Sequence, residues 1–256
     1  MYRENIYDVI NATGERVSAL LVPINRRLKA YTWKVLGEAG LKMDEAKQIA
    51  EDTLEVGGLK LVLRRGENIP QAIVEFARKG EVVLGITGDD LYDENRLQRP
   101  NSILRVENTY DWFDEAAKFY RPALCLFNRT GNAEDIPRPK NWNSSSILDS
   151  PKLPTAALNE KYLETSKNYL QKSPLTGDIK MWRSMIEGGS NMESYVKRDG
   201  KRRGADCGID IVYTGKTLKE LGLKIVDIVR FSDLVVVSPL RNGPTLEALA
   251  RKASSS

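Results

Sequence analysis

The chain has 256 residues, of which 41% are hydrophobic and 29% charged, a composition typical of a globular protein with one large or two small domains. Its formal charge of +4 suits an anionic ligand and falls short of a dedicated nucleic-acid binder. The sequence contains no histidine, which excludes Ser-His-Asp and Cys-His catalysis and every histidine-containing metal site.

The first hundred residues alternate strand-like and helix-like segments. Strands are predicted at 17–24, 59–63 and 82–87, and helices at 28–39 and 68–79. Pro70 stands in the first turn of the second helix, where proline is favoured. This alternation is typical of a parallel α/β sheet, and it sets the fold class.

The remainder of the chain is less regular. A strand is predicted at 123–127, a helix at 158–170, and strands at 209–213, 225–229 and 234–237. The stretch 131–154 is rich in Pro, Asn and Ser and is predicted to be a surface insertion.

The two cysteines, Cys125 and Cys207, lie far apart in the sequence, which excludes a zinc cluster or a redox pair, and we expect a reducing, cytoplasmic location. Cys207 has no base nearby in the sequence to activate it and is interpreted as structural. The apolar run 17–24 is short, follows several charges and lacks a small-residue cleavage site. No run is long enough to span a bilayer, and we expect no membrane partner.

The sharpest local signal is Asp210-Ile-Val-Tyr-Thr-Gly-Lys-Thr217, which predicts a strand, a short turn and a helix at 218–221. Backbone N–H groups at such a turn, the helix N-terminus and the hydroxyls of Thr214 and Thr217 form an anion pocket that fits a phosphate. A triphosphate P-loop needs glycine where Asp210 stands, so the kinase or ATPase interpretation fails.

A carboxylate four residues before a phosphate turn is placed to accept hydrogen bonds from ribose hydroxyls, which indicates a ribose 5-phosphate group. The residues leave one alternative open. In it, Asp210 faces solvent on an edge strand, and a capping box runs from Thr217 to Glu220.

A second signal is Leu84-Gly-Ile-Thr-Gly-Asp-Asp90, where a buried strand meets two glycines and a hydroxyl at its carboxyl end. Open α/β sheets bind ligands at that end, and glycines let a ligand approach the backbone. A strand followed by an ordinary Gly-Asp turn explains the same residues, and this alternative also stays open.

Together the two segments resemble the catalytic subunit of ATP phosphoribosyltransferase, the glycosyltransferase family that starts histidine biosynthesis. Its members look like Gly-Ile-Thr-Gly-acid early in the chain and Ala-Asp-x-x-x-Asp-x-Val-x-Thr-Gly-x-Thr-Leu late. The second pattern reads here Gly204-Ala-Asp-Cys-Gly-Ile-Asp-Ile-Val-Tyr-Thr-Gly-Lys-Thr-Leu218. Further similar stretches are 23–40, 68–70, 189–193 and 222–223, whereas 100–155 matches poorly.

The resemblance implies an α/β, two-lobed fold like that of type II periplasmic binding proteins, with a central cleft that holds the active site. Residues 1–100 and 226–256 would form lobe one, and residues 101–225 lobe two. The expected catalytic residues are Arg27 and Asp210. The implied substrate-binding residues are Gly85, Thr87, Gly88, Asp89, Asp206, Asp210, Thr214, Gly215, Lys216 and Thr217.

The implied substrates are ATP and phosphoribosyl pyrophosphate. Asp210 and the turn would hold the ribose and its 5-phosphate, while Arg27 and the 85–89 turn would lie near the pyrophosphate or the nucleotide. N1 of the adenine would displace pyrophosphate from the ribose C1, a reaction that needs alignment and charge neutralisation more than acid–base catalysis. Mg²⁺ would be bound mainly through the pyrophosphate, with no metal ligands on the protein.

Two departures stand out. Asn25-Arg26 occupies the place of the family's Lys-Gly, which would permit another acceptor, and Val82-Val83 replaces Ala-Asp. The basic run 197–203 is interpreted as a phosphate or polyanion contact or as a solvated loop. The short stretch after Val237 resembles the family's short form, which implies a homo- or hetero-oligomer with a synthetase-like regulatory subunit.

Two other functions compete with the transferase. The first is a non-catalytic or repurposed bilobal paralogue that binds a small anion or nucleotide without turnover. The second is a nucleic-acid binder that uses the 197–203 run, which we do not expect because the remaining positive charge is dispersed.

Overall fold

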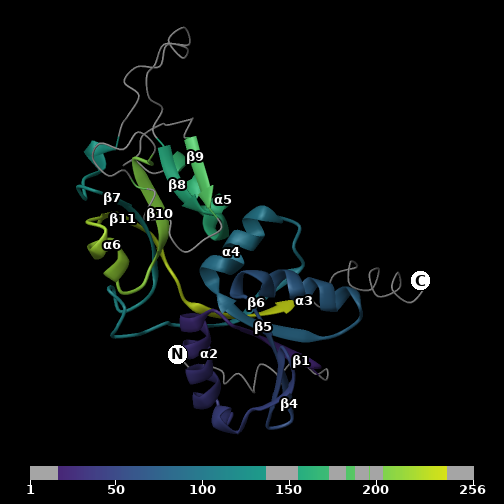
Figure 1. Ribbon diagram of the computed structural model, residues 1–256. Coiled ribbons are helices and arrows are strands. Elements are labelled where there is room, and N and C mark those ends of the chain that lie inside the picture. Colours follow the sequence, from purple (N-terminus) through teal and green to yellow (C-terminus); the bar gives the residue numbers. More distant parts are fainter. Residues whose placement is uncertain (1–16, 137–154, 173–182, 188–195, 197–203, 241–256) are drawn as a thin grey trace. The chain divides into compact units, whose positions relative to one another are not determined.

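The computed structural model describes residues 17–136, 155–172, 183–187, 196 and 204–240 (Figure 1). The chain divides into two compact units, one of Met1–Trp112 with Asp233–Ser256 and one of Phe113–Ser232. Each unit is built on its own sheet, with seven strands in the first and five in the second. The α/β class with two lobes that the sequence predicts is thereby confirmed.

The first unit alternates strands and helices as far as residue 98 and then gains two further strands. Its elements are β1 (Ala19–Pro23), α2 (Arg26–Glu38), η1 (Met43–Glu45), β2 (Lys47–Ala50), β3 (Thr53–Val56), β4 (Leu59–Arg64), η2 (Gly66–Asn68), α3 (Ile69–Arg78), β5 (Val83–Gly88), α4 (Asp89–Gln98), β6 (Leu104–Tyr110) and β12 (Leu234–Pro239).

The sheet of this unit runs in the order β2-β3-β4-β1-β5-β12-β6 and is mixed rather than parallel. Only β4, β1 and β5 are parallel to one another. A tight turn at Gly57 and Gly58, both with positive φ, makes β3 antiparallel to β4. Figure 1 shows β12, in yellow, beside β5 and β6, to which it pairs antiparallel. The parallel arrangement that the alternation indicates is therefore limited to the three central strands, and the outer strands pair antiparallel.

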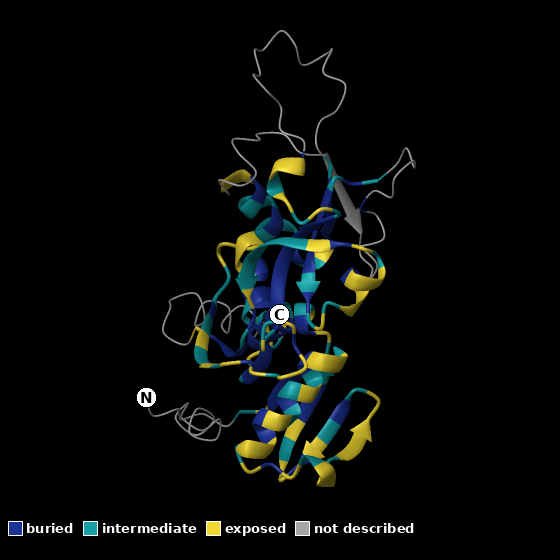
Figure 2. Ribbon diagram, turned by 90° about the vertical axis from the view of Figure 1, so that its left-hand side faces the viewer, coloured by how far each residue is buried: buried dark blue, intermediate teal, exposed yellow. Residues whose placement is uncertain are grey.

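The apolar periodicity explains why these segments pack. All five residues of β1 are buried, and α2 buries a stripe of Leu28, Thr32, Val35 and Leu36. Figure 2 shows the same contrast between the buried sheet and the helix faces that remain exposed. No helix among the described residues is long and apolar enough to cross a membrane.

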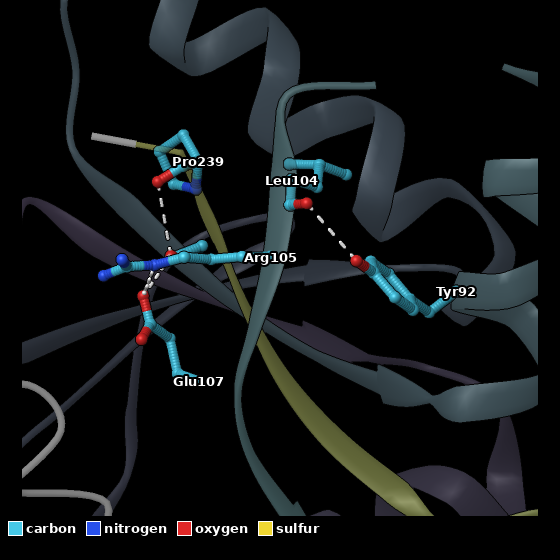
Figure 3. Close-up of polar contacts among 6 residues, drawn as sticks. Tyr92, Leu104, Arg105, Glu107 and Pro239 are labelled. Atoms are coloured by element: carbon cyan, nitrogen blue, oxygen red, sulfur yellow. Dashed lines mark hydrogen bonds and ion pairs between the residues drawn. The ribbon is translucent and has the colours of Figure 1, made fainter. Parts of the chain in front are cut away.

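Polar contacts join the late strand β12 to β6 (Figure 3). Arg105 Nε lies 2.7 Å from Glu107 Oε1, and the buried Ser238 hydroxyl donates to the same carboxylate. On the other side of β6, the Tyr92 hydroxyl donates to the Leu104 carbonyl at 3.3 Å. The Ser238 bond thus links two strands that lie far apart in the sequence, and the Tyr92 bond links α4 to β6.

The second unit is built from shorter elements. They are β7 (Ala123–Asn128), η3 (Ala133–Asp135), β8 (Thr155–Asn159), η4 (Glu160–Tyr162), α5 (Leu163–Lys172), β9 (Arg183–Glu187), β10 (Cys207–Val212), α6 (Lys216–Glu220) and β11 (Lys224–Phe231). The sheet order is β11-β7-β10-β8-β9, with β10 parallel to β8 and antiparallel to β7.

The helix predicted at 158–170 is wrong at its start. Leu158 lies in β8, fully buried and in register with Ile209 of β10, and the α-helix begins only at Leu163. Burial in the sheet decides the structure of this apolar segment. Of the predicted insertion 131–154, the part 137–154 lies outside the described residues, as do 189–193 and 197–203.

Both cysteines are buried in the second unit and are free thiols. Burial raises the pKa of Cys125 to about 12, and burial raises the pKa of Cys207 as well. Both thiols therefore keep their protons near neutral pH and are poor nucleophiles, which agrees with the structural role predicted for Cys207.

Candidate functional site

Three loops meet at the carboxyl end of the parallel strands β4, β1 and β5, the edge where open α/β sheets bind ligands. Asn25, in the loop after β1, accepts a hydrogen bond from the Gly66 N–H at 2.6 Å, and its amide donates to Glu67 Oε2 at 3.1 Å. Thr87, at the end of β5, donates from its hydroxyl to the Gly66 carbonyl at 2.9 Å. The two side chains thus hold the loop after β4 in place.

Gly85 makes room for a helix in this unit. A Cβ atom at this position would come within 2.5 Å of Ile69 Cγ2 and 2.8 Å of Ile73 Cδ1, both on α3. Because all three residues are fully or almost fully buried, the lack of a side chain at Gly85 is required by packing whatever ligand binds nearby.

The other residues predicted for this edge lie at the starts of two helices. Gly88 is the N-cap of α4, and Asp89 is its first residue. Asp89 Oδ1 accepts a hydrogen bond from the Asp233 N–H at 2.9 Å, so this carboxylate also joins α4 to the start of β12. Arg27 lies exposed in the first turn of α2.

Asp210 lies on β10, an interior strand between β7 and β8, and is only 5% exposed. Its Oδ1 accepts hydrogen bonds from Asn159 Nδ2 at 3.1 Å and from the Ile211 N–H at 2.7 Å. Asn159 ends β8 and is buried as well. The alternative of a solvent-facing Asp210 on an edge strand is therefore wrong, since the amide of the neighbouring strand orients this carboxylate.

The turn after β10 leads directly into α6. Gly215 is the N-cap of α6 with a φ of 71°, in the left-handed region that glycine adopts without steric cost. Thr214 Oγ1 accepts a hydrogen bond from the Lys216 N–H at 3.3 Å, and Thr214, Lys216 and Thr217 are all exposed. Thr217 lies inside α6, so it does not cap the helix as the alternative with a capping box requires.

This arrangement places a buried carboxylate one turn away from exposed hydroxyls and from the backbone N–H groups that begin a helix. Such N–H groups have no intrahelical acceptors. N–H groups and hydroxyls donate to phosphate oxygens, whereas a carboxylate accepts from sugar hydroxyls. The chemistry of the group Asp210, Thr214, Gly215 and Thr217 is therefore suited to a phosphorylated sugar.

A second loop, residues 113–121, packs against this turn and was not predicted from the sequence. The Lys118 N–H donates to the Tyr213 carbonyl at 2.6 Å, and the Tyr213 hydroxyl donates to the Asp114 carboxylate. A Cβ atom at Gly215 would lie 3.0 Å from Lys118 Cδ. The only sequence signal in this loop is its aromatic content, which indicates packing and names no ligand.

Asp206 precedes β10 and holds the start of the neighbouring strand. Its Oδ2 accepts a hydrogen bond from the Thr155 N–H at 2.9 Å, while its own N–H donates to the Thr155 carbonyl at 2.7 Å. In the ranges that the structure describes, no group of three or more Cys, Asp or Glu side chains is placed to hold a metal ion.

The fold and the turn define a class of protein: a two-lobed α/β protein in which the turn between β10 and α6 is suited to phosphate. The fold is similar to that of a solved ATP phosphoribosyl transferase (HisG:HisZ) complex from Thermotoga maritima, with a TM-score of 0.58 and 18% sequence identity. That similarity covers 93% of this chain and 99% of the solved one.

The chain belongs to the ATP phosphoribosyltransferase (HisG) family, whose model matches residues 69–243. The match includes β5, β10 and the turn before α6. Relatives named ATP phosphoribosyltransferase are 26% identical over 221 residues in Saccharolobus solfataricus and 28% identical over 225 residues in Sulfurisphaera tokodaii. The alignments cover 85% and 86% of this chain, which spans only 63% and 64% of the length of those two relatives.

Proposed function

We propose that the protein transfers the phosphoribosyl group of phosphoribosyl pyrophosphate to ATP, which is the first step of histidine biosynthesis. The C1–N1 bond to adenine forms while the bond from C1 to the pyrophosphate oxygen breaks, so the products are phosphoribosyl-ATP and pyrophosphate. The observation that carries the proposal is the buried Asp210 beside the Gly215 turn, within the span that matches the family model.

In this proposal the second unit binds the sugar phosphate. Asp210, held by the Asn159 amide, accepts hydrogen bonds from the ribose hydroxyls. Thr214, Gly215, Lys216 and Thr217 surround the 5-phosphate with hydroxyl, N–H and ammonium donors. Asp206 contributes by fixing the start of β8 against β10.

The first unit provides the groups for the pyrophosphate and the nucleotide. Arg27 supplies a guanidinium for phosphate oxygens, and Gly85, Thr87, Gly88 and Asp89 shape the end of β5 where the nucleotide or the leaving group binds. Mg²⁺ prefers a few carboxylate ligands together with substrate phosphates, so we assign it to the pyrophosphate oxygens. When bound there, it neutralises charge that develops on the leaving group.

The reaction does not require imidazole. The leaving pyrophosphate needs positive charge and N1 of adenine needs alignment, and neither demand calls for a general base with a pKa near 7. The absence of histidine from the sequence is therefore compatible with the proposed chemistry.

The assembly and the location are part of the same proposal. The solved structure of similar fold is described as a HisG:HisZ complex, and we propose that this chain likewise acts in an oligomer with a synthetase-like regulatory subunit. We further propose that it works in the cytoplasm, where the precursors ATP and phosphoribosyl pyrophosphate are made.

The direct test is pyrophosphate release from phosphoribosyl pyrophosphate, ATP and Mg²⁺, with the chain alone and with a synthetase-like subunit added. We expect release that depends on ATP and that falls by about 100-fold or more in Asp210→Ala, because the ribose loses a charged acceptor inside the site. Saturable binding of phosphoribosyl pyrophosphate without any release under either condition would favour the non-catalytic paralogue.

A further inference from the structure

The 113–121 loop is held against the candidate phosphate turn by its backbone. Its Asp114 N–H donates to the Tyr120 carbonyl at 2.8 Å, and the Tyr120 N–H donates to the Ala117 carbonyl at 3.0 Å. The Lys118 N–H bonds to the Tyr213 carbonyl, which immediately precedes the turn. The position of Lys118 is therefore set by main-chain bonds that do not depend on its side chain.

Tyr120 shows how firmly this loop is held. Its φ of 60° lies in the left-handed region, and it is the only described residue other than glycine with a positive φ. Such a conformation disfavours a bulky side chain and persists only where the surrounding bonds enforce it. The Tyr120 ring stacks on Phe113 with centroids 5.8 Å apart, which closes the loop at its base.

The side chain of Lys118 runs across the turn itself. Measured from the place where a Cβ of Gly215 would stand, Lys118 Cδ lies at 3.0 Å, Cε at 3.8 Å and Cγ at 3.9 Å. The methylene stem therefore fills the space that a side chain at 215 would take. The ammonium nitrogen, one bond beyond Cε, lies 5.9 Å from the centroid of the Phe119 ring. Lys118 is exposed, so a ligand in solution can reach this group.

The two lysines near the turn differ in their partners. Lys216 Nζ lies 3.7 Å from Glu220 Oε1 along α6, so its charge is shared with a carboxylate on the same helix. Lys118 has no carboxylate within ion-pair distance in the part of the chain that the structure describes. A lysine ammonium is a compact charge that binds phosphate well, and here it would not have to leave an acidic partner first.

We propose that Lys118 is a substrate-binding residue, whose ammonium group contacts the 5-phosphate of phosphoribosyl pyrophosphate at the Thr214–Thr217 turn. The proposal rests on the proposed function, and it adds a cation from a loop that lies in the poorly matching stretch 100–155. It also gives Gly215 a second role, because any side chain there would push the Lys118 stem aside.

The test compares Lys118→Met and Lys118→Arg with a matched control, Lys219→Met, which removes the same charge from an exposed residue of α6. Calorimetry with Mg²⁺ gives the dissociation constants of ribose 5-phosphate, phosphoribosyl pyrophosphate and pyrophosphate for each variant. Lys118→Met should weaken binding of the first two by about tenfold or more, because a charge-assisted contact is lost. The affinity for pyrophosphate should not change.

Lys118→Arg should stay within about threefold of the wild type, and Lys219→Met within about twofold, since neither removes the charge at the turn. Thermal unfolding should be the same in all variants, because the backbone bond of residue 118 remains. If the wild type binds phosphoribosyl pyrophosphate and the Lys118→Met and Lys219→Met variants bind it with equal affinity, this inference is overturned and the proposed function stands. A wild-type chain that binds no phosphoribosyl pyrophosphate would overturn both.

Discussion

The hydrogen bond from Asn159 to Asp210 is the contact whose loss tests the candidate site most sharply. Both side chains are buried, and the Asn159 amide donates to the carboxylate at 3.1 Å. Asn159→Ala removes this donor, whereas the Ile211 N–H still donates to Asp210 Oδ1. A hydrogen bond to a charged group contributes about 1.5–3 kcal/mol, and a buried charge that loses its partner costs at least as much.

Asn159 also caps a helical turn, and the stability lost with that cap must be subtracted from the effect of Asn159→Ala. Its Oδ1 caps the following 3-10 turn by accepting from the Lys161 N–H at 3.0 Å. Asn132 offers a matched control, because its Oδ1 accepts from the Glu134 N–H at the same 3.0 Å, but within the described ranges its amide donates to no buried carboxylate. Loss of such a cap costs about 1 kcal/mol.

We therefore expect Asn159→Ala to lower the free energy of unfolding by about 1.5–3 kcal/mol more than Asn132→Ala does, as measured by urea denaturation. The affinity for phosphoribosyl pyrophosphate should fall by about tenfold in Asn159→Ala only, because Asp210 loses its orientation. Equal unfolding free energies in the two variants would show that the Asn159 amide does not hold the carboxylate, and the reasoning about this site would fail.

Three further predictions follow from packing, burial and backbone conformation. Gly85→Ala should lower the melting temperature by several degrees, because overpacking against Ile69 and Ile73 costs about 1–3 kcal/mol, and an unchanged melting temperature would contradict the packing role. Burial raises the pKa of the Cys125 thiol to about 12 in the folded state, whereas an unfolded thiol loses its proton near pH 8.5. The free energy of unfolding should therefore be constant up to about pH 8.5 and should fall as the pH rises toward 12. Cys125→Ser should make this alkaline loss shallower, while the buried Cys207 thiol still contributes to it, and a loss of unchanged steepness would refute the assignment. Gly215→Ala should lower the free energy of unfolding by about 1 kcal/mol because of its φ of 71°, and it should also weaken binding of ribose 5-phosphate. Gly80→Ala, with a φ of 77° in the other unit, should lower stability alone.

The periodic elements could be predicted because their patterns report burial directly. The strand 82–87 and the helix 68–79 agree with β5 (Val83–Gly88) and α3 (Ile69–Arg78) to within one residue at each end, since a buried strand and an amphipathic helix each have a distinct period. By contrast, α4 was not predicted because Asp89–Gln98 is mostly polar, and its buried residues include Asp90, Glu94 and Asn95.

Long-range pairing could not be predicted from periodicity. β12 inserts between β5 and β6, and nothing local to Leu234–Pro239 specifies either neighbour or the antiparallel direction. The same limit applies to the site. The sequence singled out Asp210 and Gly215 through their motif, but Asn159 and Lys118 approach them from distant loops and strands that carry no motif of their own.

The most direct test of the central claim is calorimetric titration of phosphoribosyl pyrophosphate with Mg²⁺ into the wild-type chain and Asp210→Asn, repeated with ATP, GTP and AMP present. A binding measurement on the chain alone tests the site without requiring turnover. The account predicts saturable binding that Asp210→Asn weakens by at least tenfold and that is coupled to ATP rather than to GTP. Absence of binding to the wild type, or equal binding by Asp210→Asn, would contradict the assignment of this site to the ribose phosphate.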